Sequence, residues 1–425
     1  MQTLYRTCIA VATLMTSIPA AAQTTALVGA RLIDGTGRVF DSGTVVIENG
    51  RIAAAGPAAS TVIPPGATRI DLKGKTVMPG LVNAHGHVAA TRGLESNPSF
   101  YTRDNLLRQL RTYARYGVTS VFSLGDDDAA GFTLRNEQST GTLDRARLFV
   151  AGPIIAGDTA ADVVAMIARV DALKPDLLKI RVDDNLGTTK KMLEPAWRAA
   201  ITEGHRKGYR VAAHIFYLED AKKIAAAGGD MIAHSVRDRA VDESFIADMK
   251  AHDICYSPTL MREVSTFASV ETPSWVIDPF FLKGAEPGMA KLLADPAWQA
   301  KQRSGATFTM GQQYKAGLEI AKKNLKTLSD KGVRIAMGTD TGPPGRFQGF
   351  FEHLELELMV ESGLTPMQAI VSATGDAARC HKATALGTLS AGSVADVLVL
   401  SANPLENIRN TRTIEQVWIA GKKAF

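Results

Sequence analysis

The stretch VMPGLVNAHGHV, residues 77–88, decides how the rest of the chain is interpreted. It contains a short apolar run, a Pro-Gly pair, a second apolar run and then His85-Gly86-His87. Because residues two apart on a β-strand point to the same face, this spacing places the imidazoles of His85 and His87 side by side. Paired imidazoles suit zinc and neighbouring transition metals. An isolated H-x-H pattern is weak evidence, so its meaning depends on whether other strands carry matching ligands.

From Met78 onward, strand-like runs alternate with helix-like runs. Besides the strand that ends at His85, the strand-like runs cover residues 118–124, 147–152, 177–182, 210–215, 231–236, 253–259 and 333–340. Eight strands that alternate with helices predict a closed (β/α)8 TIM barrel, an α/β fold, over residues 78–385.

The segments on either side of the predicted barrel, residues 23–77 and 386–425, are rich in β-forming residues. Asn49-Gly50 lies between two such runs and is typical of a β-hairpin turn. We expect the two segments to form one small β-sandwich domain built from both chain ends.

Several predicted strands end in residues that can bind metal ions. In a barrel the carboxyl ends of the strands meet at one mouth, so residues far apart in sequence come together there. The residues are His85, His87, Lys179, His214, His234 and Asp340.

Lys179 is the unusual member of this set. Leu178 and Ile180 are expected to face the helices, which places Lys179 and Arg181 inside the barrel. Desolvation and nearby cations would lower the pKa of the Lys179 amine, and the neutral amine can combine with carbon dioxide to form a carbamate. The alternative is a lysine that caps the barrel core or pairs with Asp183.

These motifs together resemble those of the amidohydrolase superfamily. The matching residues are His85-Gly86-His87, Lys179, His214, His234 and Gly338-Thr339-Asp340, flanked by VIENGRI and GKTVMPGLVNAHGHV before the barrel and GTLSAGSVADVLVLS and VWIAGKK after it. The chain looks most similar to the imidazolonepropionase-related group, which includes binuclear prolidase-type dipeptidases and carboxypeptidase-like amidases, ochratoxin-hydrolysing relatives among them. It has NAHGH where many members have DAHxH, a minor departure because Asn83 is not a ligand. Imidazolonepropionases themselves and the related deaminases use one metal and lack the bridging lysine, so Lys179 argues against both.

The resemblance implies a metal-dependent hydrolase that acts on amide or peptide bonds with two divalent ions, zinc being preferred. His85, His87 and Asp340 would hold one ion and His214 and His234 the other, with a carbamate on Lys179 and a hydroxide bridging them. The hydroxide would attack the scissile carbonyl, while Asp340 would act catalytically by passing a proton from water to the leaving amine.

The substrate is expected to be a dipeptide or an N-acyl amino acid. Arg181 is the predicted ligand of the substrate carboxylate, although it could instead pair with Asp183 or Asp184. Tyr217 is predicted to donate a hydrogen bond to the carbonyl or carboxylate of the substrate. The long segment 259–314 is expected to cap the active site, the alternative being a helical hairpin packed on the side of the barrel. Its aromatic residues would favour a bulky aromatic acyl group, as in an ochratoxin-like amide, and they are Phe267, Trp275, Phe280, Phe281, Trp298 and Phe308.

Two other functions stay open. The same site could attack a lactone or another ester, which would make the protein a lactonase or esterase. A more distant alternative is a secreted, non-catalytic protein that binds a metal or ligand on the same barrel.

The remaining histidines have simpler interpretations. His205, His252 and His381 are expected to lie at the surface or to cap elements. For His353 the sequence leaves open a place near the mouth or on an ordinary helix surface.

The start of the chain predicts export. Residues 1–22 contain Arg6, an apolar run and Ala20-Ala21-Ala22 before Gln23, which is typical of a secretory signal and too short to span a bilayer. We therefore expect a periplasmic or secreted protein with no membrane span. Whether Cys255 and Cys380 pair is left open.

The 425 residues carry a formal net charge of +5, and the chain has no long basic run. This balance gives no reason to expect nucleic-acid binding. The expected partner is a small-molecule substrate, and a homo-oligomer is left open.

Overall fold

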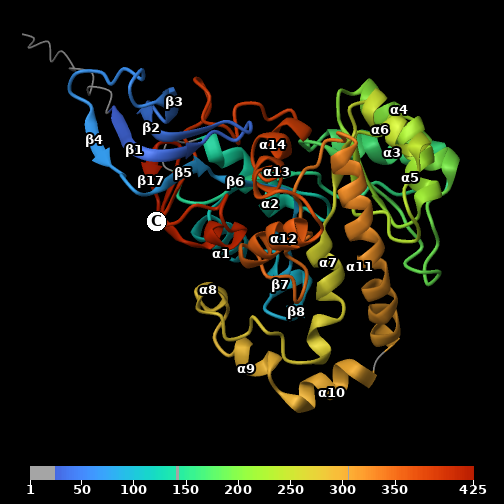
Figure 1. Cartoon of the computed structure of the whole chain (residues 1–425). Helices are drawn as coiled ribbons and strands as arrows, with labels where there is room; N and C mark the ends of the chain where they lie inside the picture. The colour runs from blue at the N-terminus through green and yellow to red at the C-terminus, as the bar shows by residue number, and fades with distance from the viewer. Residues whose placement is uncertain (1–23, 140–142, 305) are drawn as a thin grey trace, which may run out of the picture.

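The computed structural model describes residues 24–139, 143–304 and 306–425. The predicted signal sequence, residues 1–22, lies outside the described residues. Figure 1 shows a small sheet built from the two ends of the chain, a larger body of strands and helices, and a helical arm that projects from this body. Among the helices in the described ranges, none is long and apolar enough to cross a membrane.

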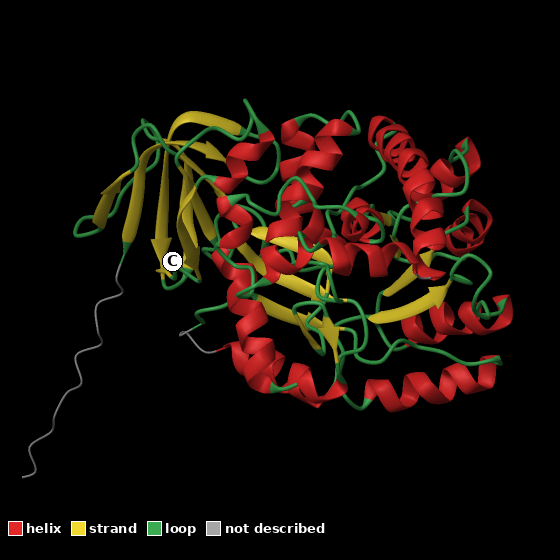
Figure 2. Cartoon of the chain, turned by 90° about the horizontal axis from the view of Figure 1, so that it is seen from below, coloured by secondary structure: helices red, strands yellow, loops and turns green. Residues whose placement is uncertain are grey.

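One sheet combines strands from both ends of the chain. Its hydrogen-bonded order is β17-β16-β15-β5-β1-β2-β3, and β4 pairs with β1. The strands are β1 (Thr25–Ile33), β2 (Val39–Glu48), β3 (Arg51–Pro57), β4 (Thr68–Asp71), β5 (Thr76–Pro79), β15 (Val397–Leu400), β16 (Ile414–Ile419) and β17 (Lys422–Lys423). In Figure 2 this sheet lies to one side of the larger body.

The turn between β2 and β3 is the hairpin that Asn49-Gly50 predicts. Glu48 pairs with Arg51 across it, and both turn residues have positive φ, 50° at Asn49 and 76° at Gly50. A two-residue turn that matches the twist of its strands requires positive φ at both positions, which Asn and Gly tolerate best.

The larger body is a TIM-barrel-like α/β arrangement of parallel strands. These are β6 (Leu81–Gly86), β9 (Val118–Ser123), β10 (Arg147–Val150), β11 (Leu178–Val182), β12 (Val211–Ile215), β13 (Met231–Ala233) and β14 (Cys255–Ser257). Neighbours pair in parallel in the orders β10-β9-β6 and β11-β12-β13-β14. A bridge from Ile155 to Ile180 links the two groups.

The eighth run, residues 333–340, is predicted as a strand and appears as an extended segment between β14 and β6. Tyr256 and Ile335 form a parallel bridge, and the amide of Ala84 donates to the carbonyl of Met337 at 2.9 Å. Asp340 at the end of this segment is thereby held beside the end of β6, where His85 and His87 lie.

Helices follow the strands and cover their outer faces. They are α1 (Arg103–Arg115), α2 (Ala129–Asn136), α3 (Ala160–Asp171), α4 (Glu194–Arg206), α5 (Leu218–Ala226), α6 (Glu243–Ala251), α12 (Phe350–Glu361) and α13 (Pro366–Ser372). In β11, Leu178 and Ile180 are buried in the same apolar core as Trp197 of α4. Because side chains alternate along a strand, Lys179 points to the opposite side, into the barrel.

Helix α14 (Gly375–Cys380) packs its apolar residues against the inward side chains of the barrel strands. Ala377, Ala378 and Cys380 belong to one buried cluster with Val82 and Phe122. A disulfide joins Cys380 to Cys255 of β14, with their Cα atoms 5.9 Å apart. The structure thus answers the question of cysteine pairing that the sequence left open.

The segment 259–314 forms the arm seen in Figure 1. It contains α7 (Leu260–Ser265), α8 (Pro279–Leu282), α9 (Met289–Leu293), α10 (Pro296–Ser304) and the start of α11 (Ala306–Asp330). Trp275 and Phe281 pack in a separate apolar cluster with Phe350 and Phe351 of α12. The central aromatic residues of the arm therefore belong to a core that the arm shares with α12, and they are not available as an aromatic lid.

Candidate metal centre

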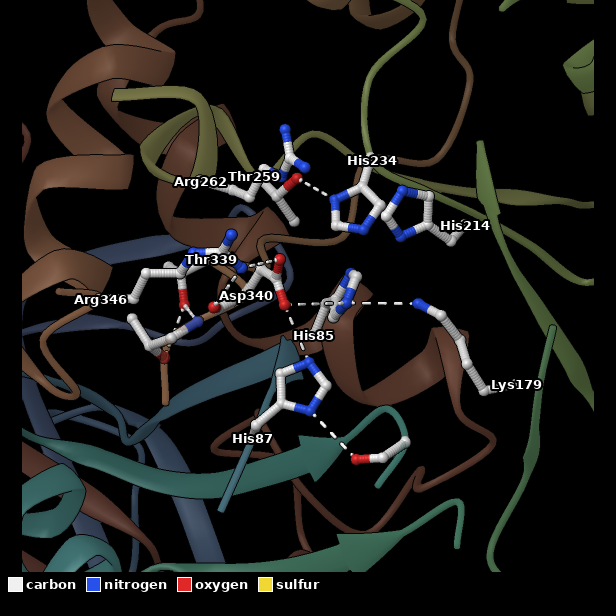
Figure 3. A network of polar contacts seen from close by, with 12 residues as sticks. His85, His87, Lys179, His214, His234, Thr259, Arg262, Thr339, Asp340 and Arg346 are labelled. Carbon is white, nitrogen blue, oxygen red and sulfur yellow. Dashed lines mark hydrogen bonds and ion pairs between the residues drawn. The ribbon is translucent and has the colours of Figure 1, made fainter. Parts of the chain in front are cut away.

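The first half of the site lies where β6 and the extended segment end. His85 and His87 occupy the end of β6, and Asp340 follows the segment that hydrogen-bonds to it (Figure 3). Asp340 Oδ1 is 2.8 Å from His87 Nε2 and 3.7 Å from His85 Nε2. One ligand atom from each residue lies within 4.8 Å of the others, so the three side chains could hold a metal ion.

The second half of the site comes from β11 and from the ends of β12 and β13. Lys179 Nζ lies 3.3 Å from His85 Nε2. The ring centroid of His234 is 4.6 Å from that of His85 and 4.0 Å from that of His214. All six residues predicted as metal ligands line one cavity of about 500 Å³.

Three of the four histidines use one ring nitrogen to bind the protein. His87 Nδ1 donates to the carbonyl of Gly125 at 3.2 Å, and His214 Nε2 donates to Asp183 Oδ2 at 2.8 Å. His234 Nδ1 is hydrogen-bonded to Thr259 Oγ1 at 2.8 Å. Metal-binding histidines commonly anchor one nitrogen in this way, which orients the other nitrogen toward the ion.

Burial sets the protonation of these groups. It lowers the pKa of His85 and His234 well below the usual value and that of His214 to about 3, so the rings are neutral near pH 7. Burial also lowers the pKa of Lys179 to about 7. Burial alone would raise the pKa of Asp340, but Arg346 and His87 hold it well below the usual value. Neutral imidazoles and an ionised carboxylate are the forms that bind cations, so the donor set fits the metal ions that the resemblance implies.

Two of these residues have a strained backbone. His234 has φ 94° and Asp340 has φ 57°, in the left-handed region that favours glycine. Such conformations cost about 1–3 kcal/mol each and persist where the surrounding structure enforces them, often at functional sites. Here His234 directly follows β13, Asp340 ends the extended segment beside β6, and both residues line the cavity.

A buried polar network, which sequence reasoning missed, connects the segments that carry His85 and Asp340. Glu352 Oε1 accepts hydrogen bonds from Asn83 at 2.6 Å, Thr339 at 2.8 Å and Thr341 at 2.7 Å. Asn83 Oδ1 in turn accepts from the amide of His85 at 3.0 Å. The network ties β6 to the segment that carries Asp340, and the available signal was a polar Asn inside an otherwise apolar strand.

Sequence reasoning also missed two arginines of the cavity wall. Arg346 contacts Asp340 Oδ2 and donates from Nε to Ser265 at 3.2 Å. Arg262 of α7 lines the same cavity and is the one residue of the 259–314 segment among the lining residues of the described chain. No spacing rule identifies them, because they approach the site from a loop and from the inserted arm.

The two predicted substrate-binding residues lie in different places. Arg181 lines the cavity, with 41% of its side chain exposed, and lies 3.9 Å from Asp183. The Tyr217 hydroxyl donates to Asp184 Oδ1 at 3.0 Å, and Tyr217 is not among the cavity-lining residues of the described chain.

The remaining histidines lie outside the cluster. His205 and His252 are exposed, as predicted. His205 is hydrogen-bonded to the carboxylate of Asp230, and His252 to the carbonyl of Asp248. His381 donates to the carbonyl of Ala84 and stacks on Phe122. His353 is neither at the mouth nor on a helix surface, because it is fully buried between Thr411 and the carbonyl of Tyr116.

Comparison with known sequences identifies relatives along much of the chain. The ochratoxinase of Aspergillus niger is 41% identical over 97 residues, which cover 21% of this chain and only 19% of that relative's length. An imidazolonepropionase of Streptomyces avermitilis is 23% identical over 427 residues, covering 91% of this chain and 87% of the relative.

Solved structures show the same fold. A putative prolidase from Bifidobacterium longum superposes with a TM-score of 0.76 at 24% identity over 94% of both chains. The A. niger ochratoxinase superposes with a TM-score of 0.74 at 20% identity over 95% of both chains.

The family described as the amidohydrolase family matches residues 76–424. This match runs from the strand before the His85–His87 pair almost to the last residue. The chain therefore belongs to the amidohydrolase family, and its sequence is similar to those of an imidazolonepropionase and an ochratoxinase.

Proposed function

We propose that the protein is a binuclear metal-dependent amidohydrolase that cleaves the amide bond of a dipeptide or an N-acyl amino acid. The observation that carries this proposal is the cluster of His85, His87 and Asp340 next to Lys179, with His214 and His234 on the far side of His85. Such a cluster of candidate ligands beside a buried lysine would suit two cations that promote hydrolysis of an unactivated carbonyl.

The chain's own residues would act as follows. Two divalent ions, which we propose to be zinc, would lower the pKa of a water molecule and polarise the scissile carbonyl when bound. The carboxylate of Asp340 would accept the proton of the water and return it to the nitrogen of the leaving amine. Arg346 keeps that carboxylate ionised before the reaction.

Lys179 is proposed to carry a carbamate. Its neutral amine would form an N–C bond to carbon dioxide and lose one proton, which leaves an anion with two oxygens between the two halves of the site. Burial and a pKa of about 7 support this, because a substantial fraction of the amine is unprotonated near neutral pH.

The proposal includes the wider organisation expected from the sequence. It comprises a complete (β/α)8 barrel, a β-sandwich from both chain ends, and export of the mature protein to the periplasm or the medium. The Cys255–Cys380 disulfide supports export, because disulfides persist in oxidising compartments.

On the acyl side of the substrate, the structure changes the expectation. Trp275, Phe280 and Phe281 pack with α12, so they do not support a preference for an aromatic acyl group. The cavity offers an apolar wall instead, which includes Leu124, Ile154 and Pro344. An ochratoxin-like amide is favoured only by the partial likeness to ochratoxinase. Arg181 lines the cavity and stays a proposed contact for the substrate, whereas Tyr217 does not line it and its hydroxyl is hydrogen-bonded to Asp184.

The test compares kcat/KM for N-benzoyl-L-phenylalanine, its carboxamide and a lactone of matched size. We expect the free acid to be hydrolysed, and to be a better substrate than the carboxamide. A lactone that is cleaved efficiently while both amides are inert would replace this proposal with a lactonase. Inertness toward all three in the metal-loaded protein would favour the non-catalytic alternative.

A further inference from the structure

At the wall of the cavity formed by α7, two buried arginine side chains contact one buried carboxylate. The side chains of Arg237 and Glu263 have no exposed surface and that of Arg262 is 7% exposed. Both guanidinium groups contact the same carboxylate, Arg237 from Nη1 and Arg262 from Nη1 at 3.0 Å. Arg237 and Arg262 therefore share Glu263. Arg237 also interacts with the buried Asp183, whereas Arg262 lines the cavity.

The Arg262 guanidinium keeps unused hydrogen-bonding capacity. Its Nε is buried and has no hydrogen-bond partner among the described residues. One face of the guanidinium lies 4.3 Å from the ring centroid of Tyr314, which fixes its plane. Burial alone would lower the pKa of Arg262, but Glu263 raises it above the usual value, so the group stays charged.

Hydrogen bonds to a buried carboxylate fix the first turn of α7. The buried carboxylate of Glu355 accepts hydrogen bonds from the amides of Leu260 at 2.8 Å and Met261 at 2.7 Å. Thr259, the residue directly before the helix, is hydrogen-bonded through its hydroxyl to His234 Nδ1. Arg262 is therefore attached to the same short segment that orients a predicted metal ligand.

We propose that the guanidinium of Arg262 is the binding site for the carboxylate of the substrate. A buried charge is costly without a partner, and a planar guanidinium binds a carboxylate through two parallel hydrogen bonds. The other two arginines of the cavity are less suited. Arg346 is engaged with Asp340, and Arg181 is 41% exposed and close to Asp183. This inference rests on the proposed function for the identity of the ligand, but the anion site itself does not depend on turnover.

The test is calorimetric binding of N-benzoyl-L-phenylalanine and of its carboxamide to the full-length, metal-free chain, in which neither ligand is hydrolysed. In Arg262→Met we expect the acid to bind about 10- to 100-fold more weakly and the carboxamide to bind as before, since a hydrogen-bonded charge is lost. Glu263 stays paired with Arg237 in this variant, so the fold should be retained. Arg262→Lys keeps the charge without the planar fork, and we expect a smaller loss for the acid.

Two other arginines serve for comparison. Arg239→Met removes an exposed charge that pairs with Asp238 outside the cavity, and it should bind both ligands like the unmodified chain. Arg181→Met should weaken binding of the acid less than Arg262→Met does.

The inference is overturned if Arg262→Met still prefers the acid, if Arg262→Lys binds the acid with unchanged affinity, or if the unmodified chain shows no preference for the acid. Loss of the preference in Arg181→Met alone would assign the role to Arg181. A failure of the proposed function would give a different result. The metal-loaded protein would not hydrolyse the amides, but the unmodified chain would still bind the acid more tightly than the carboxamide.

Discussion

At the scale of single residues, Lys179 is the residue on which the proposal of a binuclear rather than a mononuclear site depends. It is buried inside the barrel, 3.3 Å from His85 Nε2, with its pKa lowered to about 7. We predict that Lys179→Ala loses the second metal ion and reduces kcat/KM by roughly 100-fold or more, because the bridging anion is removed. Metal analysis and steady-state kinetics measure the two effects.

A short carboxylic acid such as acetate should partly restore the activity of Lys179→Ala by supplying the missing anion. Lys190→Ala is a suitable control, since Lys190 is exposed and pairs with Asp158. Intact-mass or crystallographic evidence of an unmodified Lys179 at full metal occupancy would contradict the carbamate.

At the scale of elements, the disulfide fastens helix α14 to strand β14. It joins residues 125 positions apart, and α14 packs against the inward side chains of the barrel. Because a cross-link restricts the unfolded chain, its loss should cost about 2–4 kcal/mol of stability. We predict that a reductant lowers the Tm of the oxidised protein and leaves that of Cys255→Ala/Cys380→Ala unchanged.

Thiol titration of the oxidised, unfolded protein after removal of residues 1–22 should find no free thiol, since only these two cysteines remain. Two free thiols, or a Tm that does not respond to reductant, would contradict a stabilising disulfide.

At the scale of the whole molecule, the predicted ligands come from strands spread around the barrel, between His85 and Asp340. Metal ions bound there would hold these distant segments together and stabilise the folded state by mass action, about 2.7 kcal/mol at 100 times Kd. We predict two divalent ions per chain, and loss of both activity and several degrees of Tm on chelation. Zinc should restore both, whereas one ion per chain in a fully active sample would indicate a mononuclear enzyme.

The residues that the sequence identifies correctly share a local signal. Strand parity places Lys179 inside the barrel and Leu178 and Ile180 outside it, as observed. The Asn49-Gly50 hairpin likewise depends on the φ preferences of two adjacent residues. The six predicted ligands meet at one cavity because they lie in or directly after neighbouring parallel strands, or after the extended segment beside them, and such segments end at the same side.

The features that the sequence missed depend on contacts between distant segments. Cys255 and Cys380, His353 and Thr411, and Arg262 and Arg237 become partners only when the chain is folded. The aromatic residues of segment 259–314 are expected from the sequence to belong to a cap, and only the structure shows that Trp275 and Phe281 pack against α12. The sequence by itself determined the alternation of strands with helices, which follows from periodicity, and the motifs that carry the family resemblance, which are residue types at particular positions. Only the tertiary structure decided which charges are buried and how they pair, because burial and pairing are properties of contacts that no local pattern records.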